Sequence, residues 1–360
     1  MRVAICGGGV IGVALAYYLS LRGAEPIVIE RTGIANAASG KSGGFLALDW
    51  CDGSRLADLA RRSFALHAAL AEQIPGTGYR RMTTYGGFSG GGGRRKAGTW
   101  IAERIALDRR LGTPETTAQI EPHGFTTGLM AAAEARGASV VAATVEGLLR
   151  RGDRIVGAVT DAGPIEADAV VIAIGPWSIL ACHWLPLPPV FGLKGHSIVF
   201  ETGDGIPPEA LFLEVGEAGG GVASPEVFPR PDGTLYLCGL SSETALPVDP
   251  AAVVPDPGAI ERLRAIAARV APALAEAPVL AAQACYRPVT RDGLPLIGAL
   301  PDVEGAYVAT GHSVWGMLNA PATGEALAGL ILEGDPGAID LAAFAPDRLP
   351  PFDPARLGIA

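Results

Sequence analysis

The first thirty residues combine two apolar segments, a glycine-rich turn and a helix-forming segment in a fixed order. The first apolar segment leads into Gly7, Gly9 and Gly12 with the spacing GxGxxG, and the second ends at Glu30. In such a unit the glycines allow a tight turn, close approach to a pyrophosphate and close packing of helix on strand. A carboxylate after the second strand can accept hydrogen bonds from a ribose. The pattern predicts a parallel α/β sheet that binds an ADP-containing cofactor, the alternative being a glycine-rich turn in an ordinary parallel sheet.

Residues 10–22 are predicted to form the helix of this unit. They have helix-forming composition and stop at Gly23, which suits a helix C-terminal cap. Exposed amides at the start of the helix would hold the phosphates. The residues of this unit predicted to bind the cofactor are Gly7, Gly9, Val10, Ile11, Gly12, Glu30 and Arg31.

Length and composition narrow the class of protein. The chain has 360 residues, which favours two connected domains, and its 49% hydrophobic and 18% charged residues are typical of a globular enzyme. The formal net charge of −9 disfavours binding to nucleic acid or to an anionic membrane. The apolar run at residues 169–182 is interrupted by Gly175 and Pro176 and is too short to span a bilayer, so no membrane insertion is expected. The five histidines are dispersed, and no metal site is predicted.

The cysteines indicate a reducing compartment. Five are present, widely spaced and without a CxxC pair, and they are interpreted as reduced thiols of a cytoplasmic protein. They are Cys6, Cys51, Cys182, Cys238 and Cys285.

A second loop of small residues follows shortly after Glu30. Residues 37–44 read Ala-Ala-Ser-Gly-Lys-Ser-Gly-Gly. A P-loop is excluded, because the first glycine of its motif would fall on Ala35 and no strand leads directly into the loop. We expect the backbone here to pass under a flat cofactor, with a surface turn as the alternative. The predicted contacts are Ser39, Gly40, Lys41, Ser42, Gly43 and Gly44.

The middle of the chain leaves the nucleotide-binding pattern and returns to it. Helices are predicted at 56–74 and 128–136, and strands at 139–145, 154–160 and 169–173. Val145, Gly175 and Trp177 are expected to face the cofactor. Strands at 191–200 and 235–239 indicate a second sheet, with a turn at 229–233. The glycine-rich, basic loop at 85–96 is expected to be a solvated turn or a lid.

The C-terminal part favours a flavin over a nicotinamide. A glycine-rich loop, residues 311–316, follows a buried strand and opens a helix predicted at 317–333. Free amides and the positive end of a helix dipole would stabilise the negative charge of a reduced flavin, whereas a nicotinamide has no such need. The alternative is a helix capped by its own loop. The predicted contacts here are Gly311, His312, Val314, Gly316 and Met317.

Taken together, these segments resemble the D-amino-acid-oxidase-like (DAO) superfamily of FAD-dependent oxidoreductases, which includes glycine oxidase and sarcosine oxidase. The resemblance covers nearly the whole chain, and within the superfamily it is closest to a poorly characterised group with the pattern Gly-His-Ser-x-Trp-Gly. Besides the N-terminal unit, it rests on Ala38-Ser39-Gly40, Ala173-x-Gly175-x-Trp177-Ser178, Lys194-Gly195, Asp292-Gly293-x-Pro295-x-Ile297-Gly298, Gly311-His312 and Pro321-Ala322-Thr323-Gly324.

The resemblance implies an α/β fold with two domains. An FAD-binding Rossmann-like domain of the glutathione-reductase type would be formed by residues 1–75, 120–190 and 285–345. A second α+β substrate domain, built on a mostly antiparallel sheet, would be formed by 76–119 and 191–284, leaving 346–360 as a C-terminal tail. The implied reaction is hydride transfer from the carbon beside an amine to flavin N5, which gives an imine. The implied partners are an amine or amino-acid substrate and oxygen or another electron acceptor.

Four residues are predicted to contact the substrate or shape its pocket. By resemblance to glycine oxidase, Arg287 supplies a guanidinium for a substrate carboxylate; pairing with a structural carboxylate is the alternative. His312, Trp315 and Tyr286 are expected to shape the pocket above the flavin, or else to pack in the core. A second arginine of those relatives is absent from the Gly-His loop, where Val314-Trp315 stands, which favours a substrate larger or less polar than glycine.

Cys285 falls where sarcosine-oxidase-like members attach their flavin covalently. We expect a non-covalent FAD, because most buried cysteines are small core residues, and keep a thioether through Cys285 as the alternative. Two other functions stay open on the sequence alone: a flavin-binding assembly or scaffold protein without turnover, and an NAD(P)H-dependent flavin hydroxylase.

Overall fold

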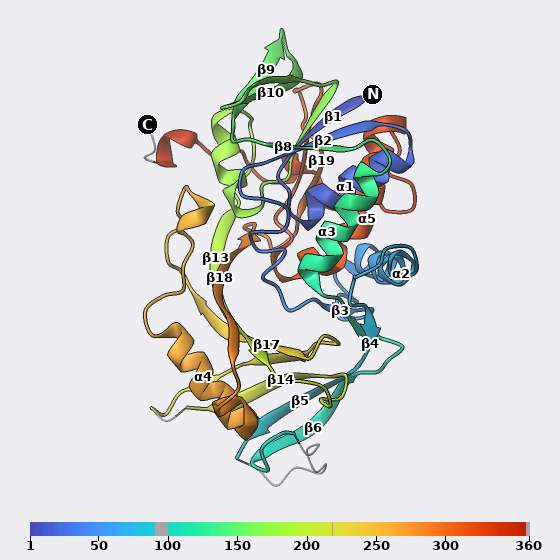
Figure 1. Cartoon of the computed structure of the whole chain (residues 1–360). Helices are drawn as coiled ribbons and strands as arrows, with labels where there is room; N and C mark the ends of the chain where they lie inside the picture. Colours follow the sequence, from blue (N-terminus) through green and yellow to red (C-terminus); the bar gives the residue numbers. More distant parts are fainter. Residues whose placement is uncertain (91–99, 218, 358–360) are drawn as a thin grey trace.

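The computed structural model describes residues 1–90, 100–217 and 219–357, and two large sheets dominate it. Figure 1 shows them at opposite ends of the molecule, with β1, β2 and β8 in the upper part and β5, β6 and β14 in the lower part. Two long strands, β13 (Phe191–Glu201) and β18 (Val279–Val289), run between the two parts.

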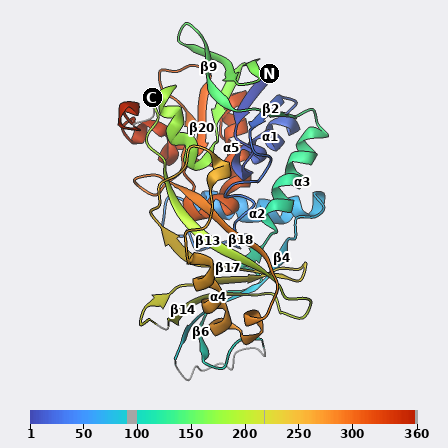
Figure 2. The same cartoon turned by 60° about the vertical axis from the view of Figure 1, so that its left-hand side comes forward.

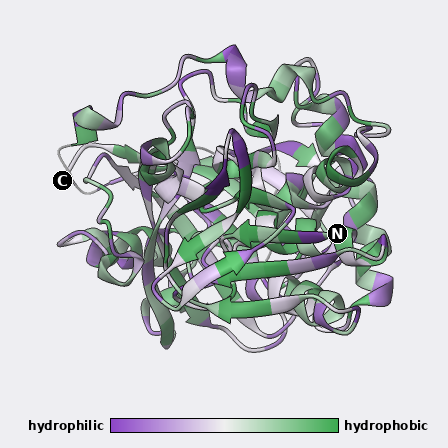
Figure 3. Cartoon of the chain, turned by 90° about the horizontal axis from the view of Figure 1, so that it is seen from above, coloured by the Kyte–Doolittle hydropathy of each residue, from purple (hydrophilic) through white to green (hydrophobic). Residues whose placement is uncertain are grey.

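The upper sheet has six strands in the order β19-β20-β12-β1-β2-β8. All neighbours are parallel except β19 and β20. Its strands stand out as hydrophobic in Figure 3, as expected for a parallel sheet covered on both faces. They are β1 (Arg2–Cys6), β2 (Glu25–Glu30), β8 (Ser139–Ala142), β12 (Ala169–Ile172), β19 (Leu296–Ala299) and β20 (Ala306–Thr310).

The alternation of side chains along β1 separates the two cores around this sheet. Val3 and Ile5 pack with the helices, while Ala4 and Cys6 face a second cluster on the other side. A Cβ at Gly324 of α5 would lie 2.6 Å from the backbone of Ala14 in α1, so this glycine permits the close contact of the two helices. The helices on the first face are α1 (Val10–Leu21), α2 (Ala57–Gln73), α3 (Pro122–Glu134) and α5 (Gly316–Glu333).

The other face is covered by a short helix and a small antiparallel sheet. The helix is η1 (Gly175–His183), and the sheet has the order β11-β10-β9. Its strands are β9 (Val145–Arg151), β10 (Arg154–Thr160) and β11 (Gly163–Glu166).

The lower sheet is antiparallel except for the pair β14 and β5. Helix α4 (Ala259–Val270) lies against one face of it (Figure 2). The helix buries Leu263 and Ile266 in the core formed with this sheet. The other face is turned toward the upper part. The main path is β18-β13-β17-β16-β14-β5-β6, with β15 paired to β14. The further strands are β5 (Thr83–Ser89), β6 (Ile105–Gly112), β14 (Glu209–Gly216), β15 (Val222–Ala223), β16 (Glu226–Pro229) and β17 (Thr234–Ser242).

A third small sheet, β3-β7-β4, lies where α2 approaches the lower part. Its strands are β3 (Phe45–Ala47), β4 (Arg80–Arg81) and β7 (Thr117–Gln119).

The predicted fold class is confirmed: a parallel Rossmann-like sheet is joined to a second unit on a mostly antiparallel sheet. The predicted strand at 139–145 is wrong in one respect, because it is split after Ala142. There Thr144 turns into β9 and exchanges backbone and carboxylate hydrogen bonds with Asp161. The domain limits stay a prediction. The lid or turn expected at 85–96 is wrong in its first part, because residues 85–89 belong to strand β5 and pair with β6 and β14. Residues 91–96 lie outside the described residues, as does the end of the predicted tail.

The described residues include neither a helix suited to spanning a membrane nor a group of side chains suited to a metal ion. None of their helices is long and apolar enough to cross a membrane. No three of their His, Cys, Asp or Glu side chains are grouped so that they could hold a metal ion.

The buried His67 predicts a pH-dependent stability. Its Nε2 lies 2.9 Å from the carbonyl oxygen of Met317, and burial lowers the pKa of His67 to about 4, from 6.5. Since the unfolded chain binds a proton more readily than the folded one, the free energy of unfolding falls as the pH drops below about 6.5. The titration of His67 alone should lower the free energy of unfolding by about 1.3 kcal/mol when the pH falls from about 7.5 to about 5.5.

Urea unfolding of the holoprotein at these two pH values measures the effect. His67→Gln should lose this part of the pH dependence, whereas His183→Gln, at an exposed position, should keep it. Equal pH dependence in wild type and His67→Gln would contradict the assignment. Carboxylates do not obscure the test, since their contribution is the same in wild type and in both variants and cancels in the comparison.

Candidate active site

One large cavity lies between the parallel sheet and the inner face of the lower sheet. Its volume is about 420 Å³, within the range of ligand-binding cavities. It is lined by the GxGxxG turn, the end of β2, the loop after β2, the loop before α5 and strands β13, β16, β17 and β18. Of all the predicted cofactor and catalytic residues, those outside its lining are Gly12, Gly40, Lys41, Gly44, Trp315 and Tyr286.

The glycine-rich turn forms one end of the cavity. Gly7 has φ +114°, and a Cβ there would lie 2.5 Å from the carbonyl oxygen of Ala173. Helix α1 begins after Gly9 with no side-chain cap and no acidic residue in its first turn. Ser39 reaches this helix from the second loop and accepts a hydrogen bond from the amide of Val10 at 2.9 Å. The hydroxyl proton of Ser39 and the first-turn amides are thereby placed where a phosphate group can bind.

Glu30 ends β2 and lines the same end of the cavity. Its Oε2 accepts a hydrogen bond from the amide of Gly8 at 2.9 Å, and its Oε1 accepts one from the amide of Thr32 at 2.7 Å. A carboxylate has about four acceptor sites, so the group keeps capacity for a ribose hydroxyl.

Three predicted cofactor residues have a packing role. Added Cβ atoms at Gly12, Gly40 and Gly44 would lie 2.2 Å, 2.2 Å and 2.1 Å from backbone carbonyl oxygens. These positions admit only glycine without a shift of the backbone, and they shape the turn and the loop from behind.

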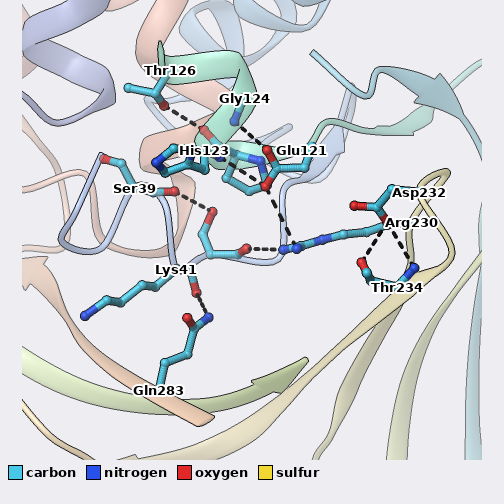
Figure 4. A network of polar contacts seen from close by, with 12 residues as sticks. Ser39, Lys41, Glu121, His123, Gly124, Thr126, Arg230, Asp232, Thr234 and Gln283 are labelled. Atoms are coloured by element: carbon cyan, nitrogen blue, oxygen red, sulfur yellow. Dashed lines mark hydrogen bonds and ion pairs between the residues drawn. The ribbon is translucent and has the colours of Figure 1, made fainter. Parts of the chain in front are cut away.

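The second loop is fixed by residues far away in the sequence, as Figure 4 shows. Arg230 Nη2 donates to the carbonyl oxygen of Ser42 at 3.1 Å, and Gln283 Nε2 donates to that of Lys41 at 3.4 Å. Lys41 Nζ in turn donates to the carbonyl oxygen of Ala284 at 3.4 Å. The lower sheet thus holds the loop that lies under the cavity.

A loop of the lower part also covers the cavity near Glu30. Arg31 pairs with Asp249 at 3.1 Å, and the indole Nε1 of Trp177 donates to the carbonyl oxygen of Pro247 at 2.8 Å. Val248 lines the cavity between these two contacts. Val145, also predicted, lies at the turn where β8 ends and β9 begins.

The loop before α5 forms the opposite end of the cavity. Helix α5 starts at Gly316 with no side-chain cap and no acidic residue in its first turn. His312 is buried with Nε2 3.1 Å from Thr323 Oγ1, while its Nδ1 has no hydrogen-bond partner among the described residues. Burial lowers the pKa of His312 to about 3, so the ring is neutral at physiological pH. A neutral imidazole with a free ring nitrogen is suited to a hydrogen bond with a bound ligand.

Trp315 and Tyr286 lie behind the cavity wall. Trp315 meets Trp50 edge to face with ring centroids 6.5 Å apart, and Tyr286 donates its hydroxyl proton to the carbonyl oxygen of Ala245 at 2.7 Å. The Tyr286 ring also lies 5.7 Å from Lys194 Nζ, which pairs with Asp256 at 2.5 Å. In the structure, Trp315 and Tyr286 therefore contact protein groups that support the wall of the cavity.

Arg287 lines the cavity from β18. Its Nη1 donates to Ser241 Oγ at 3.1 Å, and a Cβ on Gly195 would lie 3.4 Å from its Nη2, so the side chain crosses over β13 toward β17. Among the described residues it forms no ion pair with a carboxylate. Its guanidinium therefore keeps donors for a ligand.

The inner face of the lower sheet adds residues that the sequence reasoning missed. In the observed register Ser197 pairs with Cys238, which pairs with Glu226, and all three line the cavity together with Tyr236. The alternation of side chains along one strand predicts only which residues of that strand share a face. Their meeting depends on the strand order, which no local pattern specifies.

Cys285 lines the cavity beside these residues. Burial raises the pKa of its thiol, and the positive charge of Arg287 offsets this only in part. Because the thiolate is the nucleophilic form, we still expect a non-covalent flavin. We expect acid precipitation of the purified protein to leave all the yellow colour in the supernatant. Colour retained in the pellet, and lost in Cys285→Ala, would contradict this.

The residues present fit an FAD that spans the cavity. At one end lie the start of α1, whose first turn has no acidic residue, and Glu30, as pyrophosphate and ribose require. At the other lie the start of α5 and Nδ1 of His312, which has no partner in the described part of the chain. Between the two ends, the cavity is lined by further residues that were predicted to bind FAD.

Comparisons with known proteins agree with this geometry. Residues 2–330 match the family model described as DAO, FAD dependent oxidoreductase. The chain is 30% identical to a Schizosaccharomyces pombe protein named as an oxidoreductase, over 92% of this chain and 94% of that protein. It is 29% identical to glycine oxidase of Pseudomonas aeruginosa, over 96% and 98%.

Solved structures show the same fold. Glycine oxidase from Geobacillus kaustophilus superposes with a TM-score of 0.83 at 25% identity, covering 96% of this chain and 98% of that one. L-Proline dehydrogenase from P. horikoshii gives a TM-score of 0.81 at 20% identity, covering 96% and 97%. The match over most of the chain, together with a cavity built for FAD, shows that this protein is an enzyme that belongs to the DAO family of FAD-dependent oxidoreductases.

Proposed function

We propose that this enzyme oxidises the C–N bond of an amino acid, giving an imine that water hydrolyses. The observation that carries the proposal is Arg287, which reaches into the FAD cavity without a carboxylate partner among the described residues. An arginine fork binds a carboxylate with two parallel hydrogen bonds. The relatives named glycine oxidase and L-proline dehydrogenase also support an amino-acid substrate.

Each part of the site has a role in this reaction. When bound, FAD supplies the acceptor for the hydride that leaves the carbon beside the amine. Arg287 holds the carboxylate and so orients that carbon. The neutral His312 offers a ring nitrogen to a bound ligand, and Met317 lines the flavin end of the cavity. The chain needs no nucleophile for this chemistry, because positioning is the main requirement.

The substrate is proposed to be larger or less polar than glycine. Val314 lines the cavity in the Gly-His loop, where glycine-oxidase-like relatives are expected to carry a second arginine, and 58% of its surface is exposed. An apolar side chain at this place adds contact area for a hydrocarbon group and adds no charge for a second carboxylate.

Anaerobic mixing of the holoenzyme with a panel of amines and both enantiomers of the amino acids tests the proposal. An amino acid with an apolar side chain is expected to bleach the flavin absorbance faster than glycine does. A flavin that stays oxidised with every compound, in protein that is folded and loaded with FAD, would refute the proposed function. Bleaching by amines alone would restrict it to amine oxidation.

A further inference from the structure

A second charged side chain lines the cavity on the same sheet face as Arg287. Glu226 lies on β16 and is partly buried; its Oε2 is 3.6 Å from the thiol of Cys238 on β17. Within the described part of the chain that thiol is its one hydrogen-bond donor, and it forms no ion pair there. A thiol is a weak donor, so the carboxylate of Glu226 keeps hydrogen-bonding capacity for a ligand in the cavity.

The two charged groups approach each other over β17. Arg287 extends from β18 across Gly195 to Ser241 on β17, and Glu226 extends from β16 to Cys238 on the same strand. They are close enough for the positive charge of Arg287 to lower the pKa of Glu226. They are still not paired with each other. The cavity therefore presents a cation and a carboxyl group side by side, each with free hydrogen-bonding capacity.

The other titratable groups around Glu226 on the inner face of the lower sheet are uncharged or positively charged. Burial raises the pKa of Cys238 and Tyr236 well above their ordinary values, and it raises that of Cys285, so all three stay uncharged at neutral pH. Burial also raises the pKa of Glu226 itself, and Arg287 opposes this only in part. A carboxylate of raised pKa is a better proton acceptor than an exposed one.

An α-amino acid is complementary to this arrangement. Its carboxylate matches Arg287 and its ammonium group matches a carboxylate nearby. Flavin oxidation of a C–N bond needs the nitrogen neutral, because the departure of hydride leaves positive charge on the carbon beside it. Something must therefore accept the ammonium proton, and no other cavity-lining group of this sheet face is a carboxylate.

We propose that Glu226 binds the ammonium group of the substrate held by Arg287 and accepts its proton before oxidation. In this step an N–H bond of the ammonium group breaks, the electron pair stays on nitrogen, and a new O–H bond forms on a carboxylate oxygen of Glu226. The inference rests on the proposed function and names the residue that selects an amino acid over a plain carboxylic acid.

Paired ligands test this without relying on turnover. The anaerobic holoenzyme, with its flavin reduced beforehand by dithionite so that no ligand can be oxidised, is titrated with alanine, proline and phenylalanine, and with propionate, cyclopentanecarboxylate and 3-phenylpropionate, which lack the nitrogen. Dissociation constants come from calorimetry. In wild type at least one amino acid should bind more tightly than its nitrogen-free counterpart by about tenfold or more, as expected for a charged hydrogen bond.

Glu226→Gln keeps the shape and removes the charge. It should reduce this preference to less than about threefold while leaving the affinity for the carboxylic acid nearly unchanged. Glu226→Asp, which restores a carboxylate on a shorter side chain, should recover part of the preference. Glu214→Gln, at an exposed position on β14 of the same sheet, is the matched control and should behave as wild type.

The pH dependence gives a second readout. If Glu226 accepts the proton, the acidic limb of the kcat/KM profile should be lost in Glu226→Gln and retained in Glu214→Gln. An unchanged preference and an unchanged profile in Glu226→Gln would overturn the inference while leaving the proposed function intact, since flavin bleaching by amino acids would persist. If no ligand of either set binds and none bleaches the flavin, both the inference and the proposed function fall.

Discussion

Replacing Arg287 by methionine is expected to lower kcat/KM for amino-acid substrates by about 30-fold to 1,000-fold. Truncating one partner of a buried, hydrogen-bonded charge pair costs about 2 to 4 kcal/mol, and each 1.4 kcal/mol is a factor of ten. Methionine fills similar volume, so the cavity should keep its shape. Among the described residues Arg287 forms no ion pair with a carboxylate, so the substitution breaks no salt bridge there.

The size of the effect should depend on the substrate. An amine that lacks a carboxylate has no group for Arg287 to bind. At a pH where Glu226 is ionised in both proteins, its kcat/KM should change by less than about threefold. Arg287→Lys keeps the charge but loses the planar fork, and should recover only part of the activity on amino acids. Stopped-flow reduction of the flavin with matched amine and amino-acid pairs measures both.

A nearby arginine serves as the control. Arg291 is exposed and forms no described ion pair, so Arg291→Met should leave both classes of substrate unaffected. Equal losses on amines and amino acids in Arg287→Met would mean that the residue supports the wall and does not hold the carboxylate, which was the alternative considered from the sequence.

The first βαβ unit could be predicted from the sequence because its determinants are local. The GxGxxG spacing, the stop at Gly23 and the apolar run before Glu30 all lie within thirty residues, and α1 and β2 form where they were expected. Helix α5 could be predicted equally well, since a glycine-rich loop precedes a long helical pattern. In such segments neighbours along the chain decide the structure.

The inner face of the lower sheet could not be predicted in the same way. Glu226 and Arg287 meet because β16, β17, β13 and β18 are neighbours in that order, an order unlike their order in the chain. The anchor between Arg230 and Ser42 likewise joins residues far apart in sequence. Even the strand at 139–145 was misjudged for this reason, because the contacts of Thr144 with Asp161 override its local strand propensity.

Replacing Gly12 by alanine is expected to cost the protein most of its FAD. A Cβ there would lie 2.2 Å from the carbonyl oxygen of Gly7 and 3.1 Å from Cγ2 of Ile5. Since the nearer atom is backbone, the strain is relieved only by moving α1 away from the turn that would hold the pyrophosphate. Overpacking of this kind costs about 2 kcal/mol or more, which corresponds to an FAD dissociation constant raised by about 30-fold or more.

The absorbance ratio of flavin to protein in the purified variant, and calorimetric titration of apoprotein with FAD, measure this. Gly147→Ala is the matched control, because the nearest atom to its added Cβ is a Val159 carbon at 3.7 Å, and it should bind FAD as wild type does. Circular dichroism separates loss of FAD from loss of fold: a folded Gly12→Ala should regain flavin at high FAD concentration. Full FAD occupancy of Gly12→Ala at wild-type affinity would show that the turn tolerates a side chain, contrary to the packing seen between Gly12 and Gly7.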